Sequence, residues 1–469
     1  MCPCENISNN EMPVTAGQIK RPVIRPEWFF GVVGLVVGLF MALVTPPFQS
    51  PDESVHFFRA FQLSEGRLIA ERQWNEVGGN IPASIAGAVE PFESMRFNPM
   101  AKVDKSVVFR LLNEPFESEP LMWMDFRGTA FYSPVAYVPA IIGIWMAKFC
   151  GSSALEMMYA ARLVTLLCWV TLVFAAIRLT PVFKWVAVLI GLLPMHVFLA
   201  GSISEDVITN GFSMLLTAFI VRSAFAKGGT FSRREGLSIL IVSVLVSLSK
   251  HVYFLLAALT LMIPAERFGS LKRKIVYLGI LAAAGVAVDV LWGWLVSGTV
   301  ITVKWADPGM QTKFIMAYPL EYLKVLAATL STQGGLYAQS FVGVLGWLDT
   351  WLPPWVYPFY IAVMLGVATV DRGAGRPMKF SERLLVAGTC AVMFVLILTI
   401  LYIVYTTPMD TAIRGGQGRY FIPMAMAALL VLYNREVKLH ERMISLAVVI
   451  FCSIVLVVTC YTLIVRYYA

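Results

Sequence analysis

Charged residues are scarce in this chain. Asp, Glu, Lys and Arg make up 14% of its 469 residues, while hydrophobic residues make up 58%. Soluble proteins are closer to a quarter charged, so this composition excludes an ordinary soluble domain. It predicts an all-α polytopic membrane protein, because only helices or closed barrels satisfy the backbone in lipid and the apolar runs here have helical length.

The motifs of common cofactors are also missing. The sequence contains no HExxH helix, Walker A loop, GxGxxG turn or CxxC pair. Its seven cysteines form no disulfide or metal framework, and its four histidines are scattered. The net charge of +8 does not indicate a nucleic-acid partner, because the basic residues lie in short loops between apolar runs.

Long apolar runs are what the sequence has in abundance. The first, 28–45, is long enough to cross a bilayer and follows Lys20, Arg21 and Arg25. The positive-inside rule then places the tail 1–26 in the cytoplasm and the residues after Val44 outside. Across residues 27–466 we expect about 11 or 12 membrane segments, the later runs lying near 155–178, 184–200, 206–226, 237–264, 275–297, 355–370, 383–405, 417–433 and 443–466.

Two apolar runs do not fit simple alternation across the membrane. Run 131–149 contains two prolines, which indicate a surface or re-entrant helix. Run 237–264 is interrupted by Lys250 and His251. A lysine in mid-membrane would cost a few kcal/mol, so we expect two short helices with the Lys250 turn at the outer face.

Two large segments remain outside the membrane in this topology, 46–130 and 298–354. The first alternates aromatic and charged residues with many prolines, which predicts a small folded cap with short helices. Every unusual polar cluster then lies on one side of the membrane.

The first of these clusters begins the cap. Asp52, His56 and Arg59 are spaced i, i+4 and i+7, which puts them on one helical face, and Glu53 points about 100° away from Asp52. Two carboxylates, an imidazole and a guanidinium at the membrane surface suit acid–base work on a lipid-borne substrate. A Pro-capped helix with a solvated charged face explains the same residues.

A second acidic pair, Glu205 and Asp206, starts a later span. These residues, with Ser204, also suit a helix N-cap without any function. Near the end of 298–354, Gln339 and Asp349 flank glycines and tryptophans. A membrane-interface belt explains the tryptophans but not Asp349.

The last cluster is Arg414-Gly-Gly-Gln417-Gly-Arg419-Tyr420. Its glycines allow a ligand close to the backbone, and arginines bind phosphate oxygens bidentately. Two arginines in an outer loop run against the positive-inside tendency, which favours a functional reason for them.

Three of these stretches together resemble a known family. Pro51–Gly66, Gly346–Thr350 and Gln417–Pro423 are similar to signature blocks of an uncharacterised bacterial multi-pass membrane family that is grouped with the GT-C glycosyltransferases. The resemblance covers roughly residues 30 to 435. It implies a GT-C-like bundle in the bacterial cytoplasmic membrane, and a polyprenyl-phosphate sugar donor used on the outer face.

The resemblance also implies roles for single residues. Asp52 or Glu53 would be the catalytic base, Glu205–Asp206 the second acidic site, and Ser249–His251 the lysine turn of related sugar transferases. A divalent cation, Mg²⁺ or Mn²⁺, would be held by Asp52 and Asp206, although two acids are a thin ligand set. No long soluble domain follows residue 466, so a cell-envelope glycan or lipid acceptor would be recognised by the outer loops.

The remaining cluster residues are expected to bind substrate. Lys250, Arg414 and Arg419 would stabilise the leaving phosphate, and His56 and Arg59 would orient the base or bind phosphate. Gln339, Asp349, Gln417 and Tyr420 complete the predicted substrate-binding set.

Two other functions compete with a glycosyltransferase. A transporter or flippase of lipid-linked sugars would place polar residues at mid-membrane, often in two related halves, whereas here they gather at one face and no internal repeat is visible. A non-catalytic subunit of an envelope-assembly complex would tolerate loss of the Asp52 and Glu53 carboxylates.

Overall fold

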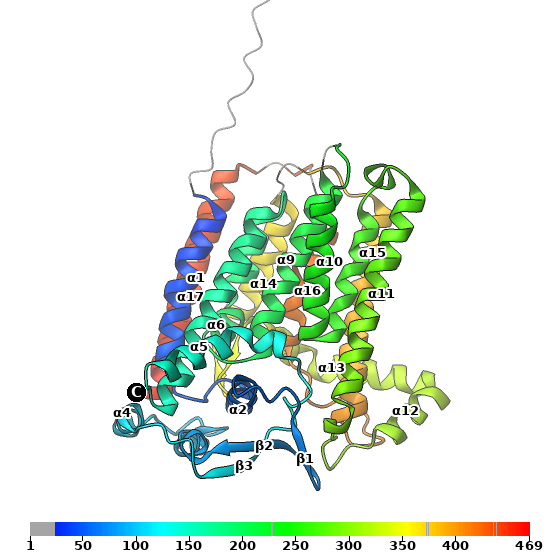
Figure 1. Cartoon of the computed structure of the whole chain (residues 1–469). Coiled ribbons are helices and arrows are strands. Elements are labelled where there is room, and N and C mark those ends of the chain that lie inside the picture. The colour runs from blue at the N-terminus through cyan, green and yellow to red at the C-terminus, as the bar shows by residue number, and fades with distance from the viewer. Residues whose placement is uncertain (1–23, 227, 372, 374, 435, 438) are drawn as a thin grey trace, which may run out of the picture.

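The protein is a helical bundle with a small cap on one face (Figure 1). The computed structural model describes residues 24–469 except 227, 372, 374, 435 and 438, so the predicted tail lies almost entirely outside the described residues, together with Lys20 and Arg21. Six described helices are long and apolar enough to cross a membrane: α1 (Pro26–Val44), α6 (Ala154–Leu179), α9 (Glu205–Phe225), α11 (Leu271–Leu295), α15 (Phe380–Tyr405) and α17 (Glu441–Tyr468). The all-α polytopic fold class is therefore confirmed.

Shorter helical pieces complete the bundle. The run 184–200 is two helices, because Pro194 lacks an N–H and holds Leu193 in an extended conformation. These pieces are α7 (Lys184–Gly191), α8 (Pro194–Ala200), α10 (Arg233–Ser249), η4 (Ala265–Phe268), α14 (Val356–Val370), η6 (Gly418–Phe421), α16 (Ile422–Leu429) and η7 (Leu430–Leu432).

Run 131–149 does not cross the bundle as one helix. It forms η2 (Pro134–Tyr137) and α5 (Val138–Phe149), and the 12 residues of α5 reach about 18 Å, against a hydrocarbon core of about 30 Å. α5 packs back on α6 at Gly143, where an added Cβ would lie 2.5 Å from the carbonyl oxygen of Ala160. This geometry agrees with the re-entrant interpretation.

The expected break at Lys250 is present. α10 ends at Ser249, Lys250 is extended, and η3 (His251–Met262) packs back against α10. The run 237–264 is therefore two short segments that meet at Lys250, as predicted.

The segment 46–130 folds as the cap. It begins with α2 (Glu53–Ser64), and its antiparallel sheet has the order β1-β2-β3, with Gly78 opposite Asp125 and Pro82 opposite Leu121. Its other elements are β1 (Glu71–Gln73), β2 (Glu76–Pro82), α3 (Ala83–Gly87), η1 (Glu90–Met95), α4 (Lys105–Asn113) and β3 (Leu121–Asp125).

The end of α17 holds the cap. The backbone N–H of Val103 donates to the Tyr467 carbonyl at 3.0 Å, and Lys102 Nζ donates to the Val465 carbonyl at 2.8 Å. Arg466 donates to the Ala101 carbonyl at 2.8 Å. The cap is thus attached to α17, the last helix of the bundle in the described residues.

Segment 298–354 is more ordered than the outer loop that the sequence predicts. It contains α13 (Pro319–Val342), a 24-residue helix that packs against η6. The other elements of this region are η5 (Ser297–Thr299), α12 (Pro308–Ala317) and the hairpin of β4 (Val344–Leu345) and β5 (Thr350–Trp351).

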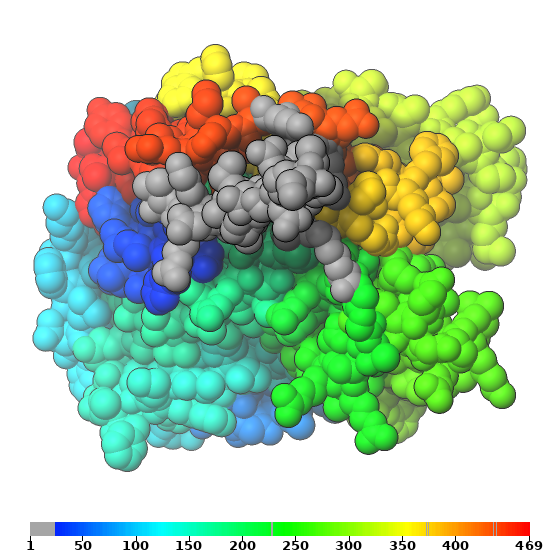
Figure 2. Space-filling model, turned by 90° about the horizontal axis from the view of Figure 1, so that it is seen from above, coloured from blue at the N-terminus to red at the C-terminus, as the bar shows by residue number. Residues whose placement is uncertain are grey.

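The face opposite the cap shows how the chain is distributed. Figure 2 shows the first half of the chain, from blue to green, on one side of the bundle and most of the second half, from yellow to red, on the other. α1 packs against α17, so the two halves meet there as well.

Candidate active site

The site starts where α1 leaves the bundle and α2 begins. Asp52 is the N-cap of α2 in the left-handed conformation (φ 61°), so it does not continue the helical face of the residues after it. Its side chain is 46% exposed, whereas Glu53 is fully buried. The two adjacent carboxylates therefore have different surroundings.

Glu53 is held in a structural pair. Arg162 of α6 donates to it twice, from Nε at 2.7 Å and from Nη2 at 2.5 Å, and the Ile203 N–H adds a third bond at 3.1 Å. Arg162 also donates to the carbonyls of Ala42 and Thr45 at the end of α1. This burial leaves Glu53 no access to an acceptor and argues against the catalytic role that the resemblance implied for it as an alternative to Asp52.

The second acidic pair lies at a capped helix start and also faces Lys250. Ser204 caps α9 by accepting a hydrogen bond from the Asp206 N–H at 3.2 Å. The side chains of Glu205 and Asp206 both reach Lys250, whose Nζ lies 3.0 Å from Glu205 Oε1 and 2.8 Å from Asp206 Oδ1. The lysine turn and the acidic pair thus form one cluster.

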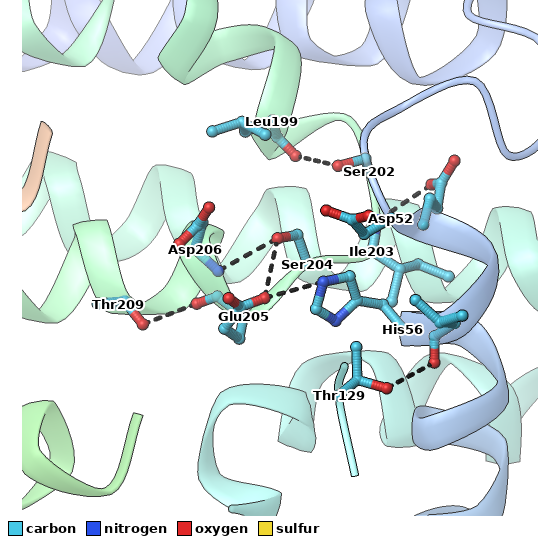
Figure 3. A network of polar contacts seen from close by, with 12 residues as sticks. Asp52, His56, Thr129, Leu199, Ser202, Ile203, Ser204, Glu205, Asp206 and Thr209 are labelled. Atoms are coloured by element: carbon cyan, nitrogen blue, oxygen red, sulfur yellow. Dashed lines mark hydrogen bonds and ion pairs between the residues drawn. The ribbon is translucent and has the colours of Figure 1, made fainter. Parts of the chain in front are cut away.

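His56 joins α2 to this cluster (Figure 3). Its Nε2 lies 3.0 Å from Glu205 Oε2, and its Nδ1 lies 2.7 Å from the Tyr137 hydroxyl. The Glu205 carboxylate accepts a hydrogen bond from the Nε2–H of His56, so in the neutral ring Nδ1 is the acceptor for the Tyr137 hydroxyl. His56 is 4% exposed, so it orients the cluster from inside.

Arg419 of η6 lies between the acidic residues. Its Nη2 donates to Asp52 Oδ2 at 3.0 Å, and its Nε lies 3.7 Å from Asp206 Oδ2. η6 approaches α13 closely because Gly418 has no side chain: an added Cβ there would lie 2.0 Å from the Tyr337 carbonyl oxygen. The glycine allows the close approach that positions Arg419.

Three tyrosines surround Lys250. Its Nζ lies 5.1 Å from the ring centroid of Tyr420 and 5.8 Å from that of Tyr132, and the Tyr253 hydroxyl donates to the Tyr420 carbonyl at 2.6 Å. Burial, reinforced by the Glu205 carboxylate, raises the pKa of Tyr132 well above 10, so its phenol stays protonated. Sequence reasoning missed Tyr132, Tyr137 and Tyr253 as site residues. Of these three, only Tyr253 could have been found from the sequence, because it lies three residues after Lys250.

Two predicted site residues stabilise the cap or its attachment instead. Arg59 donates to Gln62 Oε1 at 2.5 Å and to the carbonyls of Leu68 and Tyr132. Burial lowers its pKa to about 10. Asp349 pairs with Arg466 at 3.0 Å and so helps to attach the cap to α17. Neither reaches Asp52 or Lys250 through an ion pair or hydrogen bond in the described part of the chain.

Three other predicted residues make no hydrogen bond or ion pair with the acidic cluster in the described residues. Arg414 pairs with Asp410 at 2.7 Å, and its side chain is 64% exposed. Gln339 is half-buried on α13, and its side chain makes no hydrogen bond within the described ranges. Gln417 precedes η6, and its Oε1 is buried without a hydrogen-bond partner.

The geometry does not fit the expected metal ion. Asp52 and Asp206 face the same guanidinium, and the charge of Arg419 between them repels a divalent cation. No group of three or more His, Cys, Asp or Glu side chains in the described residues is arranged to hold a metal. The function proposed below therefore uses none.

The site thus brings together residues from four parts of the chain: Asp52, His56, Glu205, Lys250 and Arg419. The sequence profile described as "Predicted membrane protein (DUF2142)" matches residues 35–430. The chain belongs to the DUF2142 family. The DUF2142 match contains all five of these residues. No curated protein and no solved structure matches the chain.

Proposed function

We propose that this chain is a membrane glycosyltransferase, with a polyprenyl-phosphate sugar as donor and a cell-envelope glycan or lipid as acceptor. One observation carries the proposal. Asp52 is a half-exposed carboxylate bonded to Arg419, and Arg419 also lies 3.7 Å from Asp206, which pairs with Lys250. A base and two cations at one membrane surface are what attack on a phosphate-linked sugar requires.

The reaction is a substitution at the anomeric carbon. The acceptor hydroxyl oxygen bonds to that carbon, the bond from the carbon to the phosphate oxygen breaks, and the hydroxyl proton goes to Asp52. Polyprenyl phosphate leaves with the electron pair and gains negative charge. The cations of Arg419 and Lys250 stabilise that charge.

Arg419 retains donors for this task. Within the described residues only its Nη2 makes a hydrogen bond, to Asp52. Its buried Nε faces Asp206 Oδ2 at 3.7 Å, and its Nη1 makes no hydrogen bond in that part of the chain. A phosphate oxygen supplies an acceptor for such donors. Lys250 is 20% exposed beside two tyrosine rings, so it too is within reach from the cap side.

The proposal includes an orientation. The first span follows Arg25, and positive residues mark the cytoplasmic side, so the cap face lies outside the cytoplasm of a bacterial cell. Polyprenyl-linked sugars presented on that face would reach Asp52 without crossing the membrane again.

The test compares cells that lack the protein with cells that carry the wild type, Asp52→Asn or Glu71→Gln. Glu71 is the matched control, because it is a cap carboxylate with a side chain that is 50% exposed. We expect a defined sugar to disappear from envelope glycans or lipids in the deletion strain. Wild type and Glu71→Gln should restore it, and an equally abundant Asp52→Asn protein should not.

Two outcomes would contradict the proposal. Restoration by Asp52→Asn would remove the catalytic role and favour a non-catalytic subunit. Accumulation of an unchanged lipid-linked sugar on the cytoplasmic side in the deletion strain would favour a transporter or flippase.

A further inference from the structure

We infer that the cap carries a carbohydrate-binding notch, which would hold one sugar unit of an oligosaccharide acceptor. This inference rests on the proposed function for its acceptor but not for sugar binding itself. The notch lies between the start of α2, η1 and the β4–β5 hairpin, and its volume is about 20 Å³. Its polar and aromatic lining residues include Gln49, Ser54, Glu93, Arg96 and Trp347.

The volume indicates how a sugar would bind. About 20 Å³ is close to the space of a single ordered water. One hydroxyl group therefore enters the notch, and the sugar ring lies across its opening, where Glu93 and Arg96 are exposed.

A buried group in the notch lacks a partner. Gln49 is 1% exposed, and its Nε2 donates to the Phe92 carbonyl at 2.9 Å, which fixes the amide. Its Oε1 is buried and has no hydrogen-bond partner among the residues that the structure describes. An unpaired buried acceptor is costly, and a sugar hydroxyl supplies the missing donor.

The rim offers more unused groups around an aromatic ring. The guanidinium carbon of Arg96 lies 3.9 Å from a ring centroid of Trp347, and Trp347 is held by a 3.2 Å bond from Nε1 to the Phe48 carbonyl. Within the described ranges, the side chains of Ser54, Glu93 and Arg96 make no hydrogen bond or ion pair. A carboxylate, a guanidinium and a hydroxyl match the hydroxyls of a pyranose, and the buried indole of Trp347 holds the Arg96 guanidinium in place beneath them.

The notch is adjacent in sequence to the candidate base. Gln49 and Ser54 line it, and Asp52 lies between them. An acceptor of several sugar units can therefore place one unit at the notch and a terminal hydroxyl at Asp52. A single sugar or a simple lipid alcohol would use only one of these two places.

The experiment measures sugar binding to the full chain in lipid nanodiscs by saturation-transfer NMR. The probes are methyl pyranosides of glucose, galactose, mannose and N-acetylglucosamine. We expect at least one to bind, and Arg96→Ala and Trp347→Leu each to weaken that binding about tenfold, the size of losing one charge-assisted contact. Trp74→Ala, at an exposed cap tryptophan, is the matched control and should bind normally.

The variants separate this inference from the proposed function. Asp52→Asn should bind the pyranoside as the wild type does, even where it abolishes transfer. Arg96 is exposed, so Arg96→Ala should fold even if Trp347→Leu does not. The inference is overturned if no pyranoside binds, or if Arg96→Ala binds as tightly as Trp74→Ala. A different outcome would support the notch and refute the transferase: sugar binding that is lost in Arg96→Ala, together with no transferase activity in the wild type.

Discussion

Glu53 and Arg162 show what a single charge does inside this bundle. Both side chains are fully buried, and the pair links α2, α6 and the end of α1. Removing one partner of a buried ion pair leaves an uncompensated charge, which costs about 3–5 kcal/mol. These two residues therefore stabilise the fold and take no part in the chemistry of the site.

We predict that Arg162→Met lowers the thermal unfolding temperature of the detergent-solubilised protein by several degrees. The double variant Arg162→Met with Glu53→Leu should recover most of the loss, because no buried charge remains. Lys324→Met is the control, since Lys324 and Glu321 form an exposed pair worth about 0–1 kcal/mol. Fluorescence-detected unfolding would measure all three, and equal shifts for Arg162→Met and Lys324→Met would refute the structural role.

Residue chemistry was predictable from the sequence only in part. Asp52, His56, Glu205, Lys250 and Arg419 were all candidates, because charged residues near apolar runs are costly and stand out. The sequence could not separate Asp52 from Glu53, since the partners that distinguish them, Arg419 and Arg162, lie far away in the chain.

The contact between η6 and α13 positions a whole group of site residues. Gly418 lies against the backbone of α13. A Cβ added at this position would lie 2.0 Å from the Tyr337 carbonyl oxygen and 2.1 Å from the Phe341 nitrogen. Neither atom belongs to a flexible side chain. A larger residue must therefore push η6, and with it Arg419, away from α13.

We predict that Gly418→Ala destabilises the protein by about 1–3 kcal/mol, the usual cost of overpacking, and abolishes restoration of the envelope sugar. Gly335→Ala on α13 is the matched control, because nothing lies within 4 Å of its added Cβ. Complementation and thermal unfolding would both be measured. Normal activity of Gly418→Ala would show that η6 has room to move.

Element boundaries were predictable where a residue conflicts with its surroundings. Lys250 interrupts an apolar run and marks the break between α10 and η3, and the prolines of run 131–149 mark a short return segment. α13 was missed, because Glu321, Lys324 and other polar residues made 298–354 read as a loop. Its partial burial against η6 is a tertiary contact that no local pattern shows.

Across the whole molecule, the proposed orientation puts the cap outside the cytoplasm. Cys150, at the end of α5, is exposed, and the nearby Lys148 pairs with Glu65 at the end of α2, so this turn lies on the cap face. Cys390 and Cys452 are buried in the bundle. The accessibility of these cysteines to a thiol reagent therefore shows which face of the protein lies outside the cytoplasm.

We predict that a membrane-impermeant maleimide labels Cys150 in intact spheroplasts of a bacterium that expresses a variant with Cys2 and Cys4 changed to Ser. Cys150→Ser should remove the labelling, since Cys390 and Cys452 are buried and the partly exposed Cys168 and Cys460 lie inside the apolar helices α6 and α17, where a membrane-impermeant reagent does not reach. Mass spectrometry of the labelled peptide would identify the site. Labelling of Cys150 only after the membrane is broken would reverse the orientation and place the cap in the cytoplasm.

The attachment of the cap to α17 has a consequence for how the protein is made. The ribosome completes residues 46–130 hundreds of residues before Val465, Arg466 and Tyr467, which bind Lys102, Ala101 and Val103. Domains generally fold as they emerge during synthesis, but these bonds cannot form until α17 has been inserted. Until then the cap lacks the hydrogen bonds that attach it to α17. We therefore expect it to need chaperones on its side of the membrane during synthesis.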